Sequence, residues 1–334
     1  MAGKATESDL SARRAPLALT RAHDQNGSVG TRMDGNTVLF TGASRGMGHY
    51  AALELARRGA EILVVGHHQG RGAAAADAIR AQGGSAEFLR ADMGDAEDVC
   101  ALAAAVLSRA GSIDVLIHSA GGLAPFDART PQGIDRGFAQ NFLGAFLLTR
   151  LLEERLLASA PARVIAVGSS AHELLKRIDL DELTKPSNAP SKVSKYQKGN
   201  YQMRSYQTAK LAVTTWTYGL ARRWADSGVT ANVLDPGIVK GKSGSEHYEG
   251  PAVMDILMSH LIPFFIAAGM EKGSRQYVRL AADPTLANVS GAYFVRGEPK
   301  DTSGSPLTHD PAIQSRIDEA AEAWAAPYLE SRQR

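Results

Sequence analysis

Cysteine is nearly absent from this chain, since Cys100 is the only one among 334 residues. No internal disulfide can form, which is consistent with a reducing compartment, and we expect the protein in the cytoplasm. An excess of charge of one sign is also absent, because the formal net charge is +2. Nucleic acids and acidic membrane surfaces attract strongly basic proteins, so neither is an expected partner.

Long uninterrupted apolar runs are missing as well. The most apolar segment, residues 253–270, is interrupted by Asp255, His260 and Pro263. A membrane-spanning helix needs about 20 largely apolar residues, so we expect no span. The apolar run APLAL near the N-terminus is too short for the core of a signal peptide. Histidines and cysteines do not cluster with zinc-ligand spacing, so no metal site is expected.

The chain divides into two parts by texture. Residues 1–35 are polar and show no sustained period, which predicts a flexible N-terminal extension. From residue 36 onward, short apolar runs alternate with segments of helical periodicity. Such runs, apolar throughout and separated by helices, indicate a parallel sheet that is covered on both faces. We therefore expect residues 36–334 to form a single doubly wound α/β domain with about seven strands.

The individual elements follow from the same patterns. Strands are expected at residues 37–42, 61–66, 86–92, 113–121, 163–170, 229–237 and 291–295. Helices are expected at residues 48–59, 73–84, 97–111, 138–157 and 206–225. Ligands of doubly wound folds bind at the carboxyl ends of the strands, so the motifs at these ends carry the functional prediction.

A glycine-rich turn, TGASRGMG, follows the first expected strand and opens the first helix. Gly42, Gly46 and Gly48 allow a tight turn and let backbone N–H groups approach a pyrophosphate at the positive end of the helix. Because this turn stands at the first strand–helix junction of an alternating chain, it is strong support for a dinucleotide site. The alternative, glycines that serve only a sharp turn, is less favoured.

Further motifs follow in order along the chain: HSAGG, NFLGAFLLT, VGSS, YQTAK and DPG. Together with the T-G-x-x-x-G-x-G pattern, they resemble the short-chain dehydrogenase/reductase family over residues 36–325. The SSAH context, the long gap between VGSS and YQTAK, and the tail SGAYFVRGEPK resemble its branch of retinol dehydrogenases and protochlorophyllide reductases. The resemblance implies a Rossmann-type fold and an NAD(P)-dependent oxidoreductase.

The resemblance implies four catalytic residues: Asn141, Ser169, Tyr206 and Lys210. Hydride transfer to a carbonyl builds negative charge on the oxygen, and Tyr206 can give the proton that this oxygen needs. Lys210 shares a helix face with Tyr206 and is expected to lower the pKa of the phenol. Ser169 is expected to bind the same oxygen, and Asn141 to hold a water that passes protons to the lysine.

Neighbouring residues compete for two of these roles. Ser170 lies directly after Ser169, and alignment of VGSSAH with the family pattern favours the first serine. Tyr196 and Tyr201 stand upstream of Tyr206, but only Tyr206 has a lysine four residues later.

The cofactor type depends on the end of the second strand, VVGHHQGR. It lacks the acid that accepts the ribose 2′-OH of NAD, whereas His67, His68, Arg71 and, in the glycine turn, Arg45 suit the 2′-phosphate of NADP. We therefore expect NADP(H) rather than NAD(H). The resemblance implies contacts to the cofactor from Thr41, Gly42, Ser44, Arg45, Gly46, Met47, Gly48, His67, Asp92, Met93, Ser119, Ala120, Gly121, Tyr206, Lys210, Pro236, Gly237 and Val239. Asp92 is expected to touch the adenine, to cap the next helix, or both.

By resemblance, residues 240–275 cover the substrate, and their methionine, isoleucine, leucine and phenylalanine content predicts a lipophilic ketone, aldehyde or alcohol. The alternative is core packing or a dimer face, and a homo-oligomer is compatible with the sequence. The leading hypothesis is an NADP(H)-dependent carbonyl reductase (ketoreductase) or alcohol dehydrogenase of secondary metabolism. A dinucleotide-binding sensor or scaffold without turnover and a non-redox cyclase or eliminase remain open. The Ser–Tyr–Lys–Asn set favours the first hypothesis, because a binding module needs no proton relay.

Overall fold

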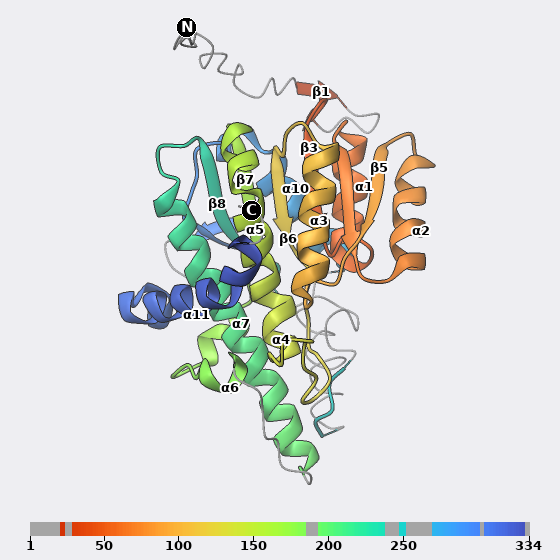
Figure 1. Cartoon of the computed structure of the whole chain (residues 1–334). Helices are drawn as coiled ribbons and strands as arrows, with labels where there is room; N and C mark the ends of the chain where they lie inside the picture. The colour runs from red at the N-terminus through yellow and green to blue at the C-terminus, as the bar shows by residue number, and fades with distance from the viewer. Residues whose placement is uncertain are drawn as a thin grey trace, which may run out of the picture.

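The structure, a computed structural model, describes residues 21–23, 29–184, 193–237, 247–251, 269–300 and 304–330. Its centre is an eight-stranded sheet in the order β10-β9-β8-β7-β6-β3-β4-β5 (Figure 1). Seven of these strands are parallel, and β10 pairs antiparallel to β9 at the edge. The expected doubly wound α/β fold is therefore confirmed. The strands are β3 (Thr37–Thr41), β4 (Glu61–Gly66), β5 (Ser85–Arg90), β6 (Val115–His118), β7 (Ala162–Val167), β8 (Val229–Asp235), β9 (Tyr293–Val295) and β10 (Glu298–Lys300).

Successive side chains of the central strands enter opposite cores. On β3, Leu39 joins the core on one face of the sheet, whereas Val38 and Phe40 join the core on the other face. All three side chains are 0% exposed. Because both faces are covered, these strands appear in the sequence as continuous apolar runs rather than as alternating ones.

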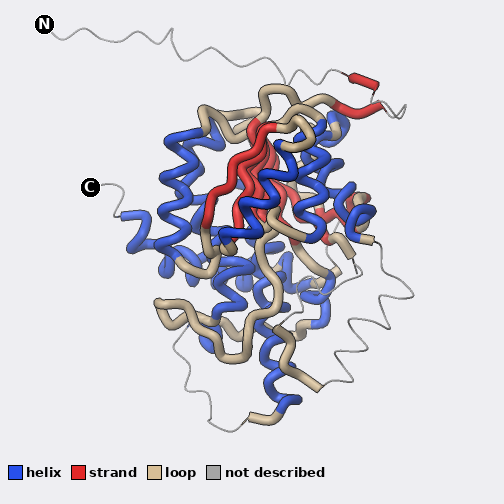
Figure 2. Tube along the Cα trace, turned by 90° about the vertical axis from the view of Figure 1, so that its right-hand side faces the viewer, coloured by secondary structure: helices blue, strands red, loops and turns tan. Residues whose placement is uncertain are grey.

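Helices form a layer on each face of the sheet, as the turned view shows (Figure 2). One core is closed by α1 (Gly46–Arg57), α2 (Gln69–Arg80) and α10 (Met270–Ala282). The other core is closed by α3 (Ala96–Arg109), α5 (Gly144–Ala158), α7 (Lys195–Arg223) and, outside them, α11 (Pro311–Glu330). In the ranges that the structure describes, no helix combines the length and hydropathy needed to cross a bilayer. Shorter helical elements are α4 (Arg136–Phe138), a π turn (Ala139–Leu143), α6 (Asp181–Thr184) and 3₁₀ turns at Ser170–Leu174, Pro284–Leu286 and Pro306–His309.

The order of the strands creates a crevice beside β3. The chain runs from β3 to β4 and β5 in one direction, and then returns to place β6 on the other side of β3. The connections on the two sides of β3 therefore diverge at the carboxyl ends of β3 and β6. Ligands of open α/β sheets bind at such a switch point.

Two helices differ from expectation. Helix α7 begins at Lys195, eleven residues before Tyr206, because Ser194 and Gln197 form a capping box ahead of a polar stretch that has no apolar period. The helix expected at residues 138–157 is interrupted by the π turn Ala139–Leu143, which contains Asn141. Helices α10 and α11 were not predicted.

The N-terminal boundary also differs from expectation. Strands β1 (Arg21–His23) and β2 (Val29–Thr31) pair antiparallel within the region expected to be a flexible extension. Met33 is 1% exposed, and its backbone N–H donates to the carbonyl oxygen of Arg58 at 2.7 Å. The packed domain therefore begins at Met33 rather than at residue 36. Residues 1–20 and 24–28 of the expected extension lie outside the described ranges.

Gly144 allows the start of α5 to lie against the loop after β5. A Cβ atom at this position would overlap the backbone carbonyl of Met93. We expect Gly144→Ala to lower the free energy of unfolding by about 1–3 kcal/mol, because neither backbone can move freely. Gly111→Ala is the matched control, because a Cβ there meets nothing within 4 Å. Equal urea midpoints for the two variants would contradict the prediction.

Candidate active site

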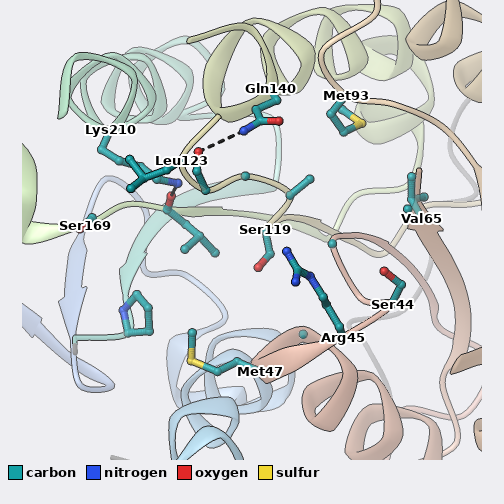
Figure 3. Close-up of a pocket in the computed structure, with 18 of the residues that line it drawn as sticks. Ser44, Arg45, Met47, Val65, Met93, Ser119, Leu123, Gln140, Ser169 and Lys210 are labelled. Carbon is teal, nitrogen blue, oxygen red and sulfur yellow. Dashed lines mark hydrogen bonds between the residues drawn. The ribbon is translucent and has the colours of Figure 1, made fainter. Parts of the chain in front are cut away.

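A cavity of about 290 Å³ opens at the carboxyl ends of the parallel strands (Figure 3). The structure brings most of the predicted site residues together in its wall. The predicted residues that line it are Gly42, Ser44, Arg45, Met47, Gly48, His67, Asp92, Met93, Ser119, Ala120, Gly121, Ser169, Tyr206, Lys210, Pro236 and Gly237.

Four predicted residues are not placed in this wall. Thr41, Gly46 and Asn141 do not line the cavity, and Val239 lies outside the described residues. The hydroxyl of Thr41 donates to the carbonyl oxygen of Ile117 at 3.2 Å and accepts from the N–H of Ser119 at 3.1 Å. Thr41 thus holds the loop after β6 against β3 instead of facing a ligand.

Several lining residues were missed by sequence reasoning. Most of them are neighbours of predicted residues at strand ends, and their only signal is this adjacency. His247 and Tyr277 come from segments far along the chain, and no motif points to them. Asp235 had a signal, because it is the acid of the DPG motif. The missed residues are Val65, Gly66, Ala91, Gly122, Leu123, Gln140, Val167, Gly168, Asp235, His247 and Tyr277.

The glycine turn is shaped by close backbone approach. Gly42 has a φ of +80°, and a Cβ there would lie 2.7 Å from the backbone N of Ala120. A Cβ on Gly48 would lie 2.6 Å from the carbonyl oxygen of Gly42. Only glycine fits these positions, so the loops after β3 and β6 can meet beside the cavity.

The N-terminus of α1 fits a bound pyrophosphate. Arg45 is its N-cap residue, and no side chain among the described residues caps the helix. The N-cap side chains of α2, α3 and α7 do accept a backbone hydrogen bond. The uncapped first-turn N–H groups of α1 are therefore available to an anion, which the helix dipole also favours. Figure 3 shows the side chain of Arg45 extending from this turn into the cavity.

The far end of the cavity carries His67 and Asp92. Asp92 accepts from the N–H of Gly94 at 2.9 Å and from the guanidinium of Arg136 at 2.5 Å. Burial raises the pKa of Asp92, but these hydrogen bonds outweigh burial and the net pKa is lowered. Asp95, not Asp92, is the N-cap of α3, so the expectation that Asp92 caps this helix is wrong.

His67 sits among cations. Partial burial lowers its pKa; Asp92 opposes this shift, while Arg71, Arg136 and Arg45 lower the pKa further. The guanidinium groups around this neutral imidazole give this end of the cavity a positive charge, which a phosphate would complement.

Ser169, Tyr206 and Lys210 meet in the wall of the cavity. The side chain of Ser169 lies close enough to the Tyr206 phenol to lower its pKa. The ammonium of Lys210 lies 5.6 Å from the centroid of the Tyr206 ring and donates to the carbonyl oxygen of Val167 at 2.8 Å. Ser170 instead points outward and is exposed. Among the two serines, only Ser169 therefore reaches Tyr206.

The competing tyrosines are placed elsewhere. The side chain of Tyr196 is 66% exposed. The hydroxyl of Tyr201 donates to the carboxylate of Asp135 at 2.9 Å. Neither lines the cavity, so of these three tyrosines only Tyr206 does.

One electrostatic expectation is wrong. The pKa of Tyr206 is raised, chiefly by burial and further by Asp235, although the hydrogen bond with Ser169 lowers it. Lys210 does not reverse this shift, because its ammonium donates to Val167 and not to the phenol. Burial lowers the pKa of Lys210 itself to about 8, against a smaller opposing effect of Asp235. In the protein without ligand, the phenol is therefore held in its protonated form.

Asn141 is 3% exposed and uses its side chain to hold the loop after β6. Its amide donates to the carbonyl oxygens of Gly122 at 2.8 Å and Gly137 at 2.7 Å. Its side-chain oxygen accepts from the N–H of Gly122 at 3.0 Å. Asn141 lies in the π turn, an irregularity that is frequent near functional sites. Its role in holding a water stays a prediction.

Comparison with known proteins agrees with this geometry. The model of the short chain dehydrogenase family matches residues 36–175. Human retinol dehydrogenase 13 is 32% identical over 293 residues, and the alignment covers 85% of this chain and 82% of the relative. Mouse retinol dehydrogenase 12 is 33% identical over 269 residues, with 80% and 79% covered. The chain belongs to the short-chain dehydrogenase/reductase family.

Solved structures of family members share the fold. An uncharacterised protein from Mycobacterium paratuberculosis has 27% identity and a TM-score of 0.65, with 88% of this chain and 95% of that chain covered. A Beutenbergia cavernae protein, provisionally an NAD(P)-dependent gluconate 5-dehydrogenase, holds NADP at low occupancy. Its identity is 25% and its TM-score 0.61, with 79% of this chain and 96% of that chain covered. Family membership makes the present chain an NAD(P)-dependent oxidoreductase of the retinol dehydrogenase-like branch.

In this family member, a short segment that begins at His247 is held to α7 beside the cavity. Gln202, one helical turn before Tyr206, donates to the carbonyl oxygens of Ala124 at 2.7 Å and His247 at 2.6 Å. It also accepts from the N–H of Glu249 at 2.9 Å. Gln202 thereby connects two loops to the helix that carries Tyr206. The other parts of the predicted cover, residues 240–246 and 252–268, lie outside the described ranges.

The buried Lys210 predicts a pH-dependent stability. Its folded pKa of about 8 lies below the ordinary lysine pKa of 10.5, so the ammonium destabilises the folded state most below pH 8, and this cost falls as pH rises toward the unfolded pKa. We compare the free energy of unfolding of Lys210→Met with that of wild type. The variant's value minus the wild-type value should become smaller by about 1–2 kcal/mol as the pH rises from 7 to 9.5, because only wild type is relieved of the cost of the ammonium. Urea unfolding of the ligand-free proteins measures this difference.

Leu211→Met is the control for this experiment. It alters a buried neighbour without removing a titratable group, so its difference from wild type should be the same at both pH values. A difference for Lys210→Met that does not change with pH would contradict the prediction.

Proposed function

We propose that the protein is an NADP(H)-dependent carbonyl reductase or alcohol dehydrogenase that acts on a lipophilic ketone, aldehyde or alcohol. The observation that carries the proposal is that Ser169, Tyr206 and Lys210 line the same cavity as the uncapped N-terminus of α1. Relatives named for retinol and the apolar sequence of residues 253–270 support a lipophilic substrate.

The residues of the cavity have distinct proposed tasks. A nicotinamide cofactor, when bound, supplies or accepts the hydride. The hydroxyl of Ser169 donates a hydrogen bond to the carbonyl oxygen of the substrate, and Tyr206 delivers the proton to that oxygen. Because the pKa of Tyr206 is raised, its phenol remains protonated at neutral pH. The site is therefore prepared for carbonyl reduction, and alcohol oxidation should need a higher pH.

The preference for NADP(H) rests on the charges at the far end of the cavity. The end of β4 offers His67 and no acid for a ribose 2′-OH. Arg45 lines the cavity, and the pKa of His67 responds to Arg71 and Arg136. These groups would complement a 2′-phosphate, and the related Beutenbergia cavernae structure holds NADP.

We also propose the cytoplasm as the location of the protein and secondary metabolism as its setting. A single cysteine suits a reducing compartment. Cell fractionation and the metabolite profile of a deletion strain would test these two points separately from the reaction.

The cofactor preference predicts the effect of Arg45→Ala. The Kd for NADPH should rise by about ten- to a hundredfold, because a guanidinium–phosphate contact is lost, while the Kd for NADH changes by less than about threefold. Fluorescence titration of both nucleotides measures this. Arg109→Ala is the control, because Arg109 is exposed, pairs with Glu87 at 2.8 Å and does not line the cavity. Equal effects on both nucleotides would contradict the preference.

The reaction is tested by NADPH oxidation with a panel of lipophilic ketones and aldehydes that includes retinal. Tyr206→Phe should lower kcat at least about a hundredfold, because the proton donor is lost, and should leave the Kd for NADPH within about threefold. Tyr196→Phe changes an exposed tyrosine and should retain the wild-type rate. A Tyr206→Phe variant with near wild-type turnover would refute the proposed role of Tyr206. A wild-type protein that binds NADPH but reduces no member of the panel would speak against the substrate class.

A further inference from the structure

Asp235 is a buried acid in the wall of the cavity, and the proposed reaction does not use it. It ends β8, directly before Pro236 and Gly237, and it is 3% exposed. It lines the cavity together with Ser169, Tyr206 and Lys210. A buried carboxylate is costly unless it is well hydrogen-bonded, so its partners indicate why it is there.

Three donors from different elements converge on this carboxylate. One oxygen accepts from the N–H of Ser170 at 2.8 Å and from the hydroxyl of Tyr293 at 3.1 Å. The other oxygen accepts from the N–H of Gly237 at 2.8 Å. Hydrogen bonds donated to a carboxylate favour its charged form. Asp235 therefore fixes the serine segment after β7 and the proline–glycine turn after β8 relative to each other.

The charge of Asp235 also reaches the proposed catalytic pair. It raises the pKa of Tyr206 and of Lys210 on α7. It has the same effect on His172 in the 3₁₀ turn after β7 and on Tyr293 in β9. Lys210 is the cation that faces it from α7. The carboxylate, which is itself 3% exposed, thus contributes negative potential to the wall of the cavity.

We propose that Asp235 is a positioning residue whose negative charge also favours the oxidised, cationic form of a nicotinamide ring over the reduced, neutral form. This inference rests on the proposed function. Carbonyl reduction transfers a hydride and a proton to the substrate, with the proton coming from Tyr206, and leaves one positive charge on the oxidised ring. A fixed carboxylate nearby would stabilise the positive charge as it develops.

The test compares nucleotide binding without substrate, so it does not depend on turnover. Asp235→Asn keeps the size of the side chain and removes its charge. The ratio of the Kd for NADP⁺ to the Kd for NADPH should rise roughly five- to thirtyfold, the range for one charge several ångströms away in a partly buried site. A purely structural role would weaken both nucleotides equally and leave the ratio unchanged.

Tyr293→Phe is the matched control. It removes one hydrogen bond to Asp235 and keeps the carboxylate, so the ratio should stay at its wild-type value. Asp235→Ser provides a second uncharged variant, should Asp235→Asn fail to fold, and should shift the ratio in the same direction. Circular dichroism confirms the fold of each variant.

The outcomes separate this inference from the proposed function. A ratio that is unchanged in the uncharged variants overturns the electrostatic role of Asp235, even if the enzyme reduces carbonyls as proposed. A ratio that shifts equally in Tyr293→Phe assigns the effect to lost hydrogen bonding and also overturns it. A wild-type protein that binds neither nucleotide refutes the proposed function itself.

Discussion

The hydrogen bond from the ammonium of Lys210 to the carbonyl oxygen of Val167, at 2.8 Å, fixes α7 against the carboxyl end of β7. Val167 is followed directly by Gly168 and Ser169, so this bond ties the helix that carries Tyr206 to the segment that carries the serine. Gly168 leaves room for the neighbouring strand β8, because a Cβ there would lie 2.7 Å from the side chain of Val233. A buried ammonium is unfavourable for folding, as its lowered pKa of about 8 indicates. Its presence is explained by the site and not by stability.

Close backbone approach is the second constraint on the cavity. The loops after β3 and β6 meet at Gly42, and the side chain of Asn141 packs where a Cβ on Gly121 would lie. At the end of the cavity that carries Asp92, Gly144 lets α5 contact Met93. These glycines lie on different elements, yet each removes a side chain where two loops converge. The crevice at the switch point of the sheet is therefore a consequence of backbone packing before any charged group is considered.

The sequence was sufficient to predict those features of the fold and the site that depend on local patterns of residues. All seven parallel strands appeared near the expected positions; the central ones are apolar throughout because they are buried on both faces, whereas β5 at the edge has only Leu89 buried. The glycine turn was predicted from its place after the first strand, and the Ser–Tyr–Lys set from the ordered motifs that resemble the family. Tyr277 and His247 could not be predicted, since only tertiary packing of distant segments places them in the cavity wall. The shift in the pKa of Tyr206 was predicted with the wrong sign, because burial dominates it and burial is a property of the whole fold.

Burial and charge act in opposite directions at the proposed proton donor. Burial and Asp235 both hold the Tyr206 phenol in its protonated form, and only the hydrogen bond with Ser169 opposes them. Lys210, with a pKa of about 8, remains an ammonium at neutral pH. A site that mainly removed protons from alcohols would need the phenolate, and a carboxylate beside the phenol would oppose it. A site that gives a proton to a carbonyl oxygen needs the phenol, and a nearby negative charge then costs it nothing before the proton moves. Once the proton has moved, the same carboxylate opposes the phenolate that remains, so the electrostatics of the ligand-free cavity set the starting protonation state of Tyr206 and not the direction of the reaction.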